Sequence, residues 1–174
     1  MQRINIVGIG CAGKTTLARA VAARLEVPHV ELDELFWGPR WTPVDEAVFR
    51  RRVDDALAPE AWVADGGYQV ARDIIWGRAD TVVWLDFSLS TVIGRWARRT
   101  TERVKSGEEF WPGTGNRETV ANLFRSGFVF WILRHYRGKR RRMATRLAAR
   151  PDLAVVHLRT PAEAAAWLNS VRPA

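Results

Sequence analysis

Apolar residues follow two alternating patterns along the chain. Short apolar or β-branched runs predict strands at 4–7, 29–33, 62–64, 81–85 and 152–158. Apolar residues three or four positions apart, typical of helices with one buried face, follow these runs at 14–25, 44–57, 89–97 and 161–171. Because strand and helix alternate, the pattern predicts a three-layer α/β fold with a parallel sheet, in one domain spanning 1–174.

The remaining segments are loops and one unusual helix. Residues 37–43 are rich in Trp and Pro, and residues 106–116 contain several Gly and Pro among polar residues, so both are predicted as loops. Residues 119–150 have a helical pattern that is aromatic at first and then strongly basic. We expect the region around 105–150 to form a lid or a basic helical segment of the domain.

Composition narrows the class of protein. The chain has 174 residues, is 47% hydrophobic and carries a formal net charge of +8, which excludes a disordered chain and points to an anionic partner. Its single cysteine excludes an intrachain disulfide and favours a reducing, cytoplasmic location. The apolar run 128–133 is too short for a membrane helix, and the start of the sequence lacks a signal-peptide pattern, so we expect no membrane partner.

A glycine-rich loop follows the first predicted strand. Residues 8–15, Gly-Ile-Gly-Cys-Ala-Gly-Lys-Thr, match the P-loop pattern G-x-x-x-x-G-K-[ST] and lead directly into a predicted helix. Backbone N–H groups of such a loop and the helix N-terminus bind phosphate oxygens. Lys14 is expected to reach the β- and γ-phosphates and Thr15 to ligate Mg²⁺. The expected nucleotide-binding residues are Gly8, Gly10, Cys11, Ala12, Gly13, Lys14, Thr15 and Thr16.

Cys11 within this loop has two interpretations. It is either a small residue at an unconstrained position, or a thiol whose acidity is increased by Lys14 and the helix terminus.

Two further segments give the chain a family resemblance. The segment 32–37 matches Leu-Asp-x-Leu-x-Trp and the segment 62–68 matches Trp-Val-x-Asp-Gly-x-Tyr. With the P-loop and the arginines after Asp86, they make the chain similar to the small P-loop kinases of the adenylate and shikimate kinase type. The resemblance is closest to the adenylate kinase-like, DNA topology modulation protein-like branch. It implies a five-stranded parallel sheet in the order 2-3-1-4-5, with ATP as donor and Mg²⁺ as cofactor.

The resemblance also implies roles for single residues. Asp33, expected at the end of the second strand, would face the phosphate acceptor, and Asp65, at the end of the third, would approach Mg²⁺ through water. Arg95 and Arg99 match the family's arginine pair, with Arg98 as a rival. The expected catalytic residues are Lys14, Asp65, Arg95 and Arg99, and the expected metal ligands are Thr15 and Asp65. The alternatives are that each aspartate caps a helix or turn and that the arginines form a solvated face.

The motifs do not identify the phosphate acceptor. Adenylate kinases carry an arginine where this chain has Gln69; Arg72 is the nearest arginine, which argues against AMP. Trp37 and Trp41 either stack on an acceptor or close their loop on the domain. Asp86, at the end of the fourth predicted strand, is either a further carboxylate of the site or part of the start of the next helix. The residues expected to bind the acceptor are Asp33, Trp37, Tyr68, Arg72 and Arg134.

The segment 134–150 holds eight basic residues and no acidic residue. It could be a lid that closes on the triphosphate, a surface that binds nucleic acid, or a solvated helix packed on the core, with a dimer as one option. Arg134 and Arg137 suit a lid, whereas Arg140, Arg141 and Arg142 suit a surface patch. His135 is expected to be packed or solvent-facing.

These observations favour one function and leave two alternatives. The favoured function is an ATP-dependent phosphotransferase that uses Mg²⁺ and acts on a small acceptor, with a nucleotide preferred. The first alternative is a nucleotide-dependent protein that binds nucleic acid through residues 134–150 or modulates DNA topology. The second is a kinase of a non-nucleotide alcohol. The sequence leaves monomer and homodimer equally open.

Overall fold

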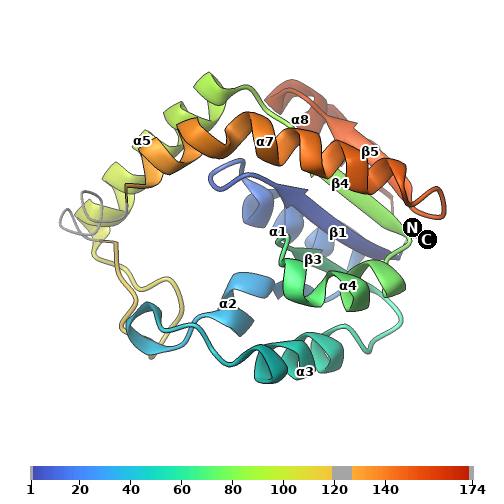
Figure 1. The fold of residues 1–174 in the computed structure, drawn as a ribbon, viewed down its shortest axis with the longest axis horizontal. Coiled ribbons are helices and arrows are strands. Elements are labelled where there is room, and N and C mark those ends of the chain that lie inside the picture. Colours follow the sequence, from blue (N-terminus) through green and yellow to red (C-terminus); the bar gives the residue numbers. More distant parts are fainter. Residues whose placement is uncertain (1, 119–126, 173–174) are drawn as a thin grey trace.

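A five-stranded parallel sheet forms the centre of the protein (Figure 1). The computed structural model describes residues 2–118 and 127–172. The strand order is β2-β3-β1-β4-β5, and every neighbouring pair is parallel. This confirms the predicted α/β fold and the strand order implied by the family resemblance.

The strands and helices alternate along the chain as the pattern predicts. The strands are β1 (Arg3–Gly8), β2 (His29–Glu31), β3 (Trp62–Asp65), β4 (Thr81–Leu85) and β5 (Ala154–Leu158). The α-helices are α1 (Lys14–Leu25), α2 (Leu32–Phe36), α3 (Glu46–Ala56), α4 (Arg72–Arg78), α5 (Leu89–Ser106), α7 (Phe128–Ala148) and α8 (Pro161–Ser170). Two short 3-10 helices are η1 (Pro39–Trp41) and η2 (Gln69–Ala71).

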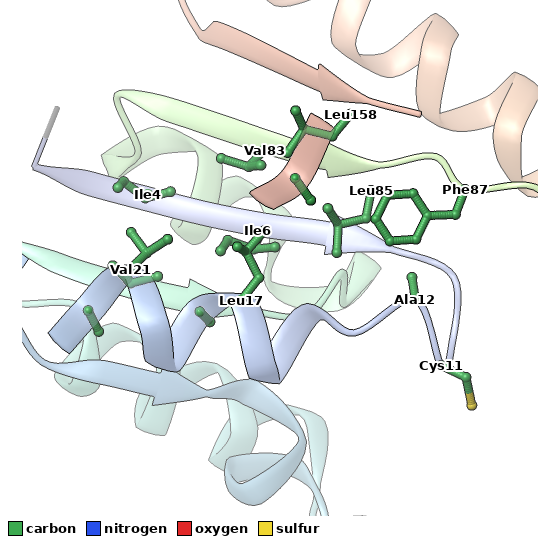
Figure 2. Close-up of a cluster of buried hydrophobic side chains, with 14 of the residues drawn as sticks. Ile4, Ile6, Cys11, Ala12, Leu17, Val21, Val83, Leu85, Phe87 and Leu158 are labelled. Atoms are coloured by element: carbon green, nitrogen blue, oxygen red, sulfur yellow. The ribbon is translucent and has the colours of Figure 1, made fainter. Parts of the chain in front are cut away.

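Alternate residues of the buried strands enter two separate cores. Ile4 and Ile6 of β1 pack with Leu17 and Val21 of α1 and with residues of α8 (Figure 2). Val7 and the neighbouring strand residues of the opposite face pack with α3 and α4. Because both faces are covered, apolar residues are favoured on both sides of each strand, which explains the absence of alternation at 81–85.

Four segments differ clearly from the sequence prediction. The helix predicted at 89–97 continues to Ser106 as α5. The strand predicted at 29–33 ends at Glu31, and residues 32–36 form α2. Leu32 is fully buried and fixes this turn of helix, so Asp33 lies in a helical first turn and not at a strand end. Helix α4 was not predicted. The helix predicted at 119–150 is described from Phe128 to Ala148, and its first part, 119–126, lies outside the described residues.

The carboxyl ends of the parallel strands meet at one edge of the sheet. In open α/β sheets this edge is where ligands bind. Asp65 is the last residue of β3, Asp86 directly follows β4, and the P-loop leads out of β1, so all three lie at this edge. Along residues 2–118 and 127–172, no helix is both long and apolar enough to cross a membrane.

Candidate active site

The P-loop turns tightly between β1 and α1. The backbone of Cys11 (φ 64°) and Gly13 (φ 90°) is left-handed, and the Ala12 N–H donates to the Ile9 carbonyl (3.2 Å). Gly13 is the N-cap of α1, so no side chain shields the first N–H groups of the helix from an anion. The Lys14 ammonium lies 3.5 Å from the Ile9 carbonyl, folded over the same loop. The loop therefore presents N–H donors and a cation together, as a polyphosphate requires.

Thr15 and Asp65 meet beside the P-loop. The Thr15 hydroxyl donates to Oδ2 of Asp65 (2.7 Å), and Nε2 of His29 is bonded to Oδ1 (2.8 Å). Asp65 is buried, so His29 and Thr15 together fix its orientation. A hydroxyl and a carboxylate oxygen this close suit Mg²⁺ that arrives with a nucleotide and takes its other ligands from phosphate and water. The described residues contain no cluster of three or more His, Cys, Asp or Glu that could hold a metal by themselves.

Helix α5 brings its arginines to the other side of the P-loop. Arg95 donates to the Ala12 carbonyl (2.5 Å), and its guanidinium lies 4.8 Å from the Phe87 ring centroid. Gly13 itself has a φ of 90°, a conformation that residues with a side chain rarely adopt, which explains why the loop has glycine there. Burial lowers the pKa of Arg95, with Arg98 adding to the shift. Arg95 thus stabilises the conformation of the P-loop through its bond to the Ala12 carbonyl.

Arg99, one turn further along α5, has a different environment. Its buried Nε has no hydrogen-bond partner among the described residues. A buried donor without a partner is costly, and a phosphate oxygen would satisfy it. Arg99 therefore suits direct contact with a phosphate, the role implied by the family resemblance.

Cys11 is buried in the loop, and its sulfur points away from the other labelled core side chains (Figure 2). Burial raises the pKa of the thiol and outweighs the opposing effect of Arg99 and Lys14. The thiol is therefore less acidic than a free cysteine, which favours the interpretation of Cys11 as a small residue.

Two cavities share Lys14 in their lining. The α5 cavity, of about 520 Å³, is bordered by the P-loop, the start of α1 and the arginines of α5. The α7 cavity, of about 670 Å³, is bordered by Gly66 to Gln69, by α4 and by α7. Lys14, Gly10 and Asp33 line both cavities. Both volumes fall in the range of about 300–1,000 Å³ that is typical of small-molecule sites.

Asp33 and Trp37 border the α7 cavity. The Tyr68 hydroxyl donates to Oδ1 of Asp33 (2.6 Å), and burial raises the pKa of Tyr68, so the phenol keeps its proton. Trp37 lines this cavity, whereas Trp41 packs against the rings of Phe110 and Trp111. Trp37 therefore lines a cavity, whereas Trp41 packs the loop against neighbouring rings.

The basic residues of α7 separate into two groups. Lys139, Arg140, Arg142 and Arg146 line the α7 cavity. Arg134 and Arg137 are exposed and line neither cavity, so we do not include the predicted acceptor ligand Arg134 in the site.

The prediction that Arg140 belongs to a surface patch is wrong, because Arg140 pairs with a buried carboxylate. Its guanidinium donates two hydrogen bonds to Asp86 (2.5 and 2.7 Å), and Nε2 of His157 bonds the same carboxylate (2.9 Å). Asp86 does not begin α5, because the Ser88 side chain caps that helix. Asp86 therefore anchors α7 to the strand ends.

The cations that line the α7 cavity repel one another. Burial lowers the pKa of Lys139, and Lys14 and Arg142 lower it further. Burial and then Arg146 lower the pKa of Arg72, which lies on α4 across the cavity. A bound anion would relieve this repulsion.

Sequence reasoning missed three residues that hold the site together. His29 orients Asp65, as described above. Asn5 is buried in β1, where its amide donates to the carbonyls of Ala64 and Gly66 and its oxygen accepts from Trp76 Nε1. Asn116 is fully buried between two loops. Each has partners far away in the sequence, so no local pattern marks it.

Comparison with known proteins supports the fold. No protein-family model matches the chain, and no curated protein matches it in sequence. Shikimate kinase from Bacteroides thetaiotaomicron is similar in structure, with a TM-score of 0.53 and 17% identity over 97% of this chain and 94% of that one. Shikimate kinase from Acinetobacter baumannii in complex with shikimate has a TM-score of 0.52 and 18% identity over 98% and 90%.

A putative kinase from Chloroflexus aurantiacus is similar to the same degree, with a TM-score of 0.52 and 16% identity over 95% and 94% of the two chains. The chain therefore has the fold of the P-loop small-molecule kinases. The finer resemblance, to the adenylate kinase-like, DNA topology modulation protein-like branch, stays a prediction.

Proposed function

We propose that the protein is a Mg²⁺- and ATP-dependent phosphotransferase that acts on a small anionic acceptor. One observation carries this proposal: the α5 cavity and the more basic α7 cavity share Lys14 and Asp33 in their linings. A kinase needs this arrangement, because donor and acceptor must approach the transferring phosphoryl group from opposite sides.

The nucleotide would occupy the α5 cavity. Its triphosphate would lie on the P-loop N–H groups, with Lys14 and Arg99 on the charged oxygens. Thr15 and Asp65 would hold Mg²⁺, which neutralises phosphate charge when bound. The protein's own contribution is to position the phosphates and to balance the charge that they carry during transfer.

The acceptor would occupy the α7 cavity. Its oxygen forms a bond to the γ-phosphorus as the bond from that phosphorus to the β–γ bridging oxygen breaks, and ADP leaves. Where the acceptor is an alcohol, Asp33 would take the hydroxyl proton, because it lines both cavities and its other partner, Tyr68, is a donor.

The charge of the α7 cavity supports an anionic acceptor. Arg72, Lys139, Arg142 and Arg146 line it, and none of the four forms an ion pair with the residues that the structure describes. Guanidinium groups bind carboxylate and phosphate groups in pairs of hydrogen bonds. The acceptor would therefore carry a carboxylate or a phosphate. Two of the similar structures are shikimate kinases, one described in complex with shikimate, which agrees with an acceptor of this kind.

The proposal is tested with a panel of acceptors and radiolabelled ATP. The panel contains nucleoside monophosphates, sugar phosphates, hydroxy acids and uncharged sugars. We expect transfer only to anionic members. The Lys14→Ala variant should lose at least about a hundredfold in turnover while keeping its fold. Transfer to uncharged sugars alone would refute the anionic acceptor, and unchanged turnover in Lys14→Ala would refute the phosphotransferase.

A matched pair of variants tests the cavity itself. Arg142→Gln should raise the acceptor KM about tenfold, because it removes one charged contact. Arg141→Gln changes the neighbouring residue of the same helix, which lies outside the α7 cavity, and should leave this KM unchanged. An equal effect of both variants would mean that the charge of α7 acts only at long range.

A nucleic-acid role is the second candidate. Arg134, Arg137 and Arg141 are exposed on α7 and have no acidic partner among the described residues, so they could neutralise phosphates of a nucleic acid. We would measure duplex DNA binding against salt concentration, with and without ATP. A steep salt dependence that Arg141→Gln reduces would favour this role, and no binding at moderate salt would exclude it.

A further inference from the structure

Two loops that border different cavities are fastened to each other. We call residues 37–43 the tryptophan loop and residues 107–118 the post-α5 loop. The two lie side by side in Figure 1, where the segment after α5 meets the segment after α2. Trp37 of the tryptophan loop lines the α7 cavity, and Phe110 of the post-α5 loop lines the α5 cavity.

Asn116 is the centre of this connection. Its Oδ1 accepts from the Trp41 N–H (2.8 Å), and its Nδ2 donates to the Gly38 carbonyl (3.0 Å). The Arg40 N–H adds a bond to the Thr114 carbonyl (3.4 Å). Asn116 is fully buried, so both of its bonds are protected from water. An amide that donates to one residue and accepts from another of the same loop fixes that loop in two directions.

Aromatic rings extend the connection to both cavities. The ring centroid of Trp41 lies 4.7 Å from Phe110 and 5.9 Å from Trp37. The Arg103 guanidinium, at the wall of the α5 cavity, lies 3.8 Å from the Phe110 ring centroid. A continuous row of contacts thus runs from the α5 cavity through Phe110, Trp41 and Trp37 to the α7 cavity.

The tryptophan loop holds an unfavourable backbone that needs this support. Arg40 (φ 56°) and Trp41 (φ 57°) are both left-handed, a conformation that non-glycine residues rarely adopt, and here it occurs twice in succession. Such backbone persists only where its surroundings hold it. Without the hydrogen bonds of Asn116, we expect the loop to relax to a less strained conformation and Trp37 to move with it.

We propose that Asn116 and Trp41 are positioning residues that make the two loops move as one body. A nucleotide that contacts Phe110 or Arg103 in the α5 cavity would then also order Trp37 in the α7 cavity. This inference rests on the proposed function in one respect, that a nucleotide binds the P-loop. It adds that nucleotide binding prepares the acceptor site through these two residues.

Hydrogen–deuterium exchange of the whole chain tests the proposal, with Mg²⁺ and the non-hydrolysable ATP analogue AMP-PNP as the probe. In the wild type, the analogue should slow exchange at 8–16, at 107–118 and at 37–43, by about fivefold or more at the last. In Asn116→Ala, exchange should still slow at 8–16 and 107–118, while 37–43 no longer responds. Asn169→Ala, an exposed asparagine on α8, is the matched control and should behave as the wild type.

Each outcome has one meaning. No slowing at 8–16 in the wild type would refute nucleotide binding, and with it the proposed function. Slowing at 8–16 without a joint response of both loops would refute the coupling alone. A response at 37–43 that survives in Asn116→Ala would show that Asn116 does not carry it. If Asn116→Ala fails to fold, Trp41→Leu serves in its place, because it removes the ring contacts with Phe110 and Trp37, and the same loss is expected.

Discussion

The ion pair between Asp86 and Arg140 should contribute measurably to stability. Asp86 has a side chain only 3% exposed and accepts two hydrogen bonds from Arg140, whose side chain is 46% exposed. Unit charges about 4 Å apart attract by about 4 kcal/mol at an effective dielectric constant near 20. Solvent around the half-exposed guanidinium reduces this to about 2 kcal/mol.

A double-mutant cycle measures this value. The cycle uses the wild type, Asp86→Asn, Arg140→Met and the double variant, each unfolded in urea. Arg140→Met should lose about 3 kcal/mol, more than the pair contributes, because Asp86 then stays buried without the guanidinium, with the His157 ring still hydrogen-bonded to it. The coupling free energy between positions 86 and 140 should be about 2 kcal/mol.

The chain supplies a control pair. Arg98 and Glu102 lie one turn apart on α5, with their side chains 79% and 67% exposed and their closest atoms 3.7 Å apart. The same cycle at this pair should give about 0.5 kcal/mol or less and should lose that value in high salt. Equal coupling at both pairs would refute the argument that burial makes the Asp86–Arg140 pair stronger. Because Arg140 anchors α7, Arg140→Met should also raise the acceptor KM.

Three further predictions follow from single contacts. Asp65→Asn should raise the Mg²⁺ concentration needed for half-maximal nucleotide binding about tenfold, measured by titration calorimetry, because it removes the charge beside Thr15. The Cys11 thiol, whose pKa burial raises, stays protonated at neutral pH, so iodoacetamide should modify it at least about tenfold more slowly than free cysteine at pH 7.5 and faster as the pH rises. Equal rates would contradict this direction of the pKa shift. Asn5→Ala should cost about 3 kcal/mol in urea unfolding, since Trp76 Nε1 and two carbonyls lose their partner.

The local patterns predict those parts of the fold that local interactions determine. The strand β4 and the helix α1 follow directly from apolar runs and stripes, and the P-loop follows from its spacing. Helix α2 escaped prediction because five residues give too few turns for a periodic pattern. Burial of Leu32, a tertiary effect, determines that helix and moves Asp33 from a strand end into a helical turn.

The residues of the candidate site also separate into those that a local motif marks and those that distant contacts place there. The sequence marks Lys14, Thr15 and Asp65 because a motif surrounds each of them. It does not mark Arg140, because its partner Asp86 lies 54 positions away and composition alone favoured a solvated patch. Asn116 contacts the tryptophan loop over 75 positions or more, and an asparagine in a glycine-rich loop is otherwise an ordinary turn residue.

The junction of the two cavities at Lys14 has a practical consequence for inhibitor chemistry. A single compound with a polyphosphate arm on the P-loop and an acidic arm among the cations of α7 would occupy both cavities at once. Joining the arms makes the second contact intramolecular, so affinity rises without any new interaction. If the chain is the proposed phosphotransferase, the length of the linker that binds best would then measure the gap between donor and acceptor.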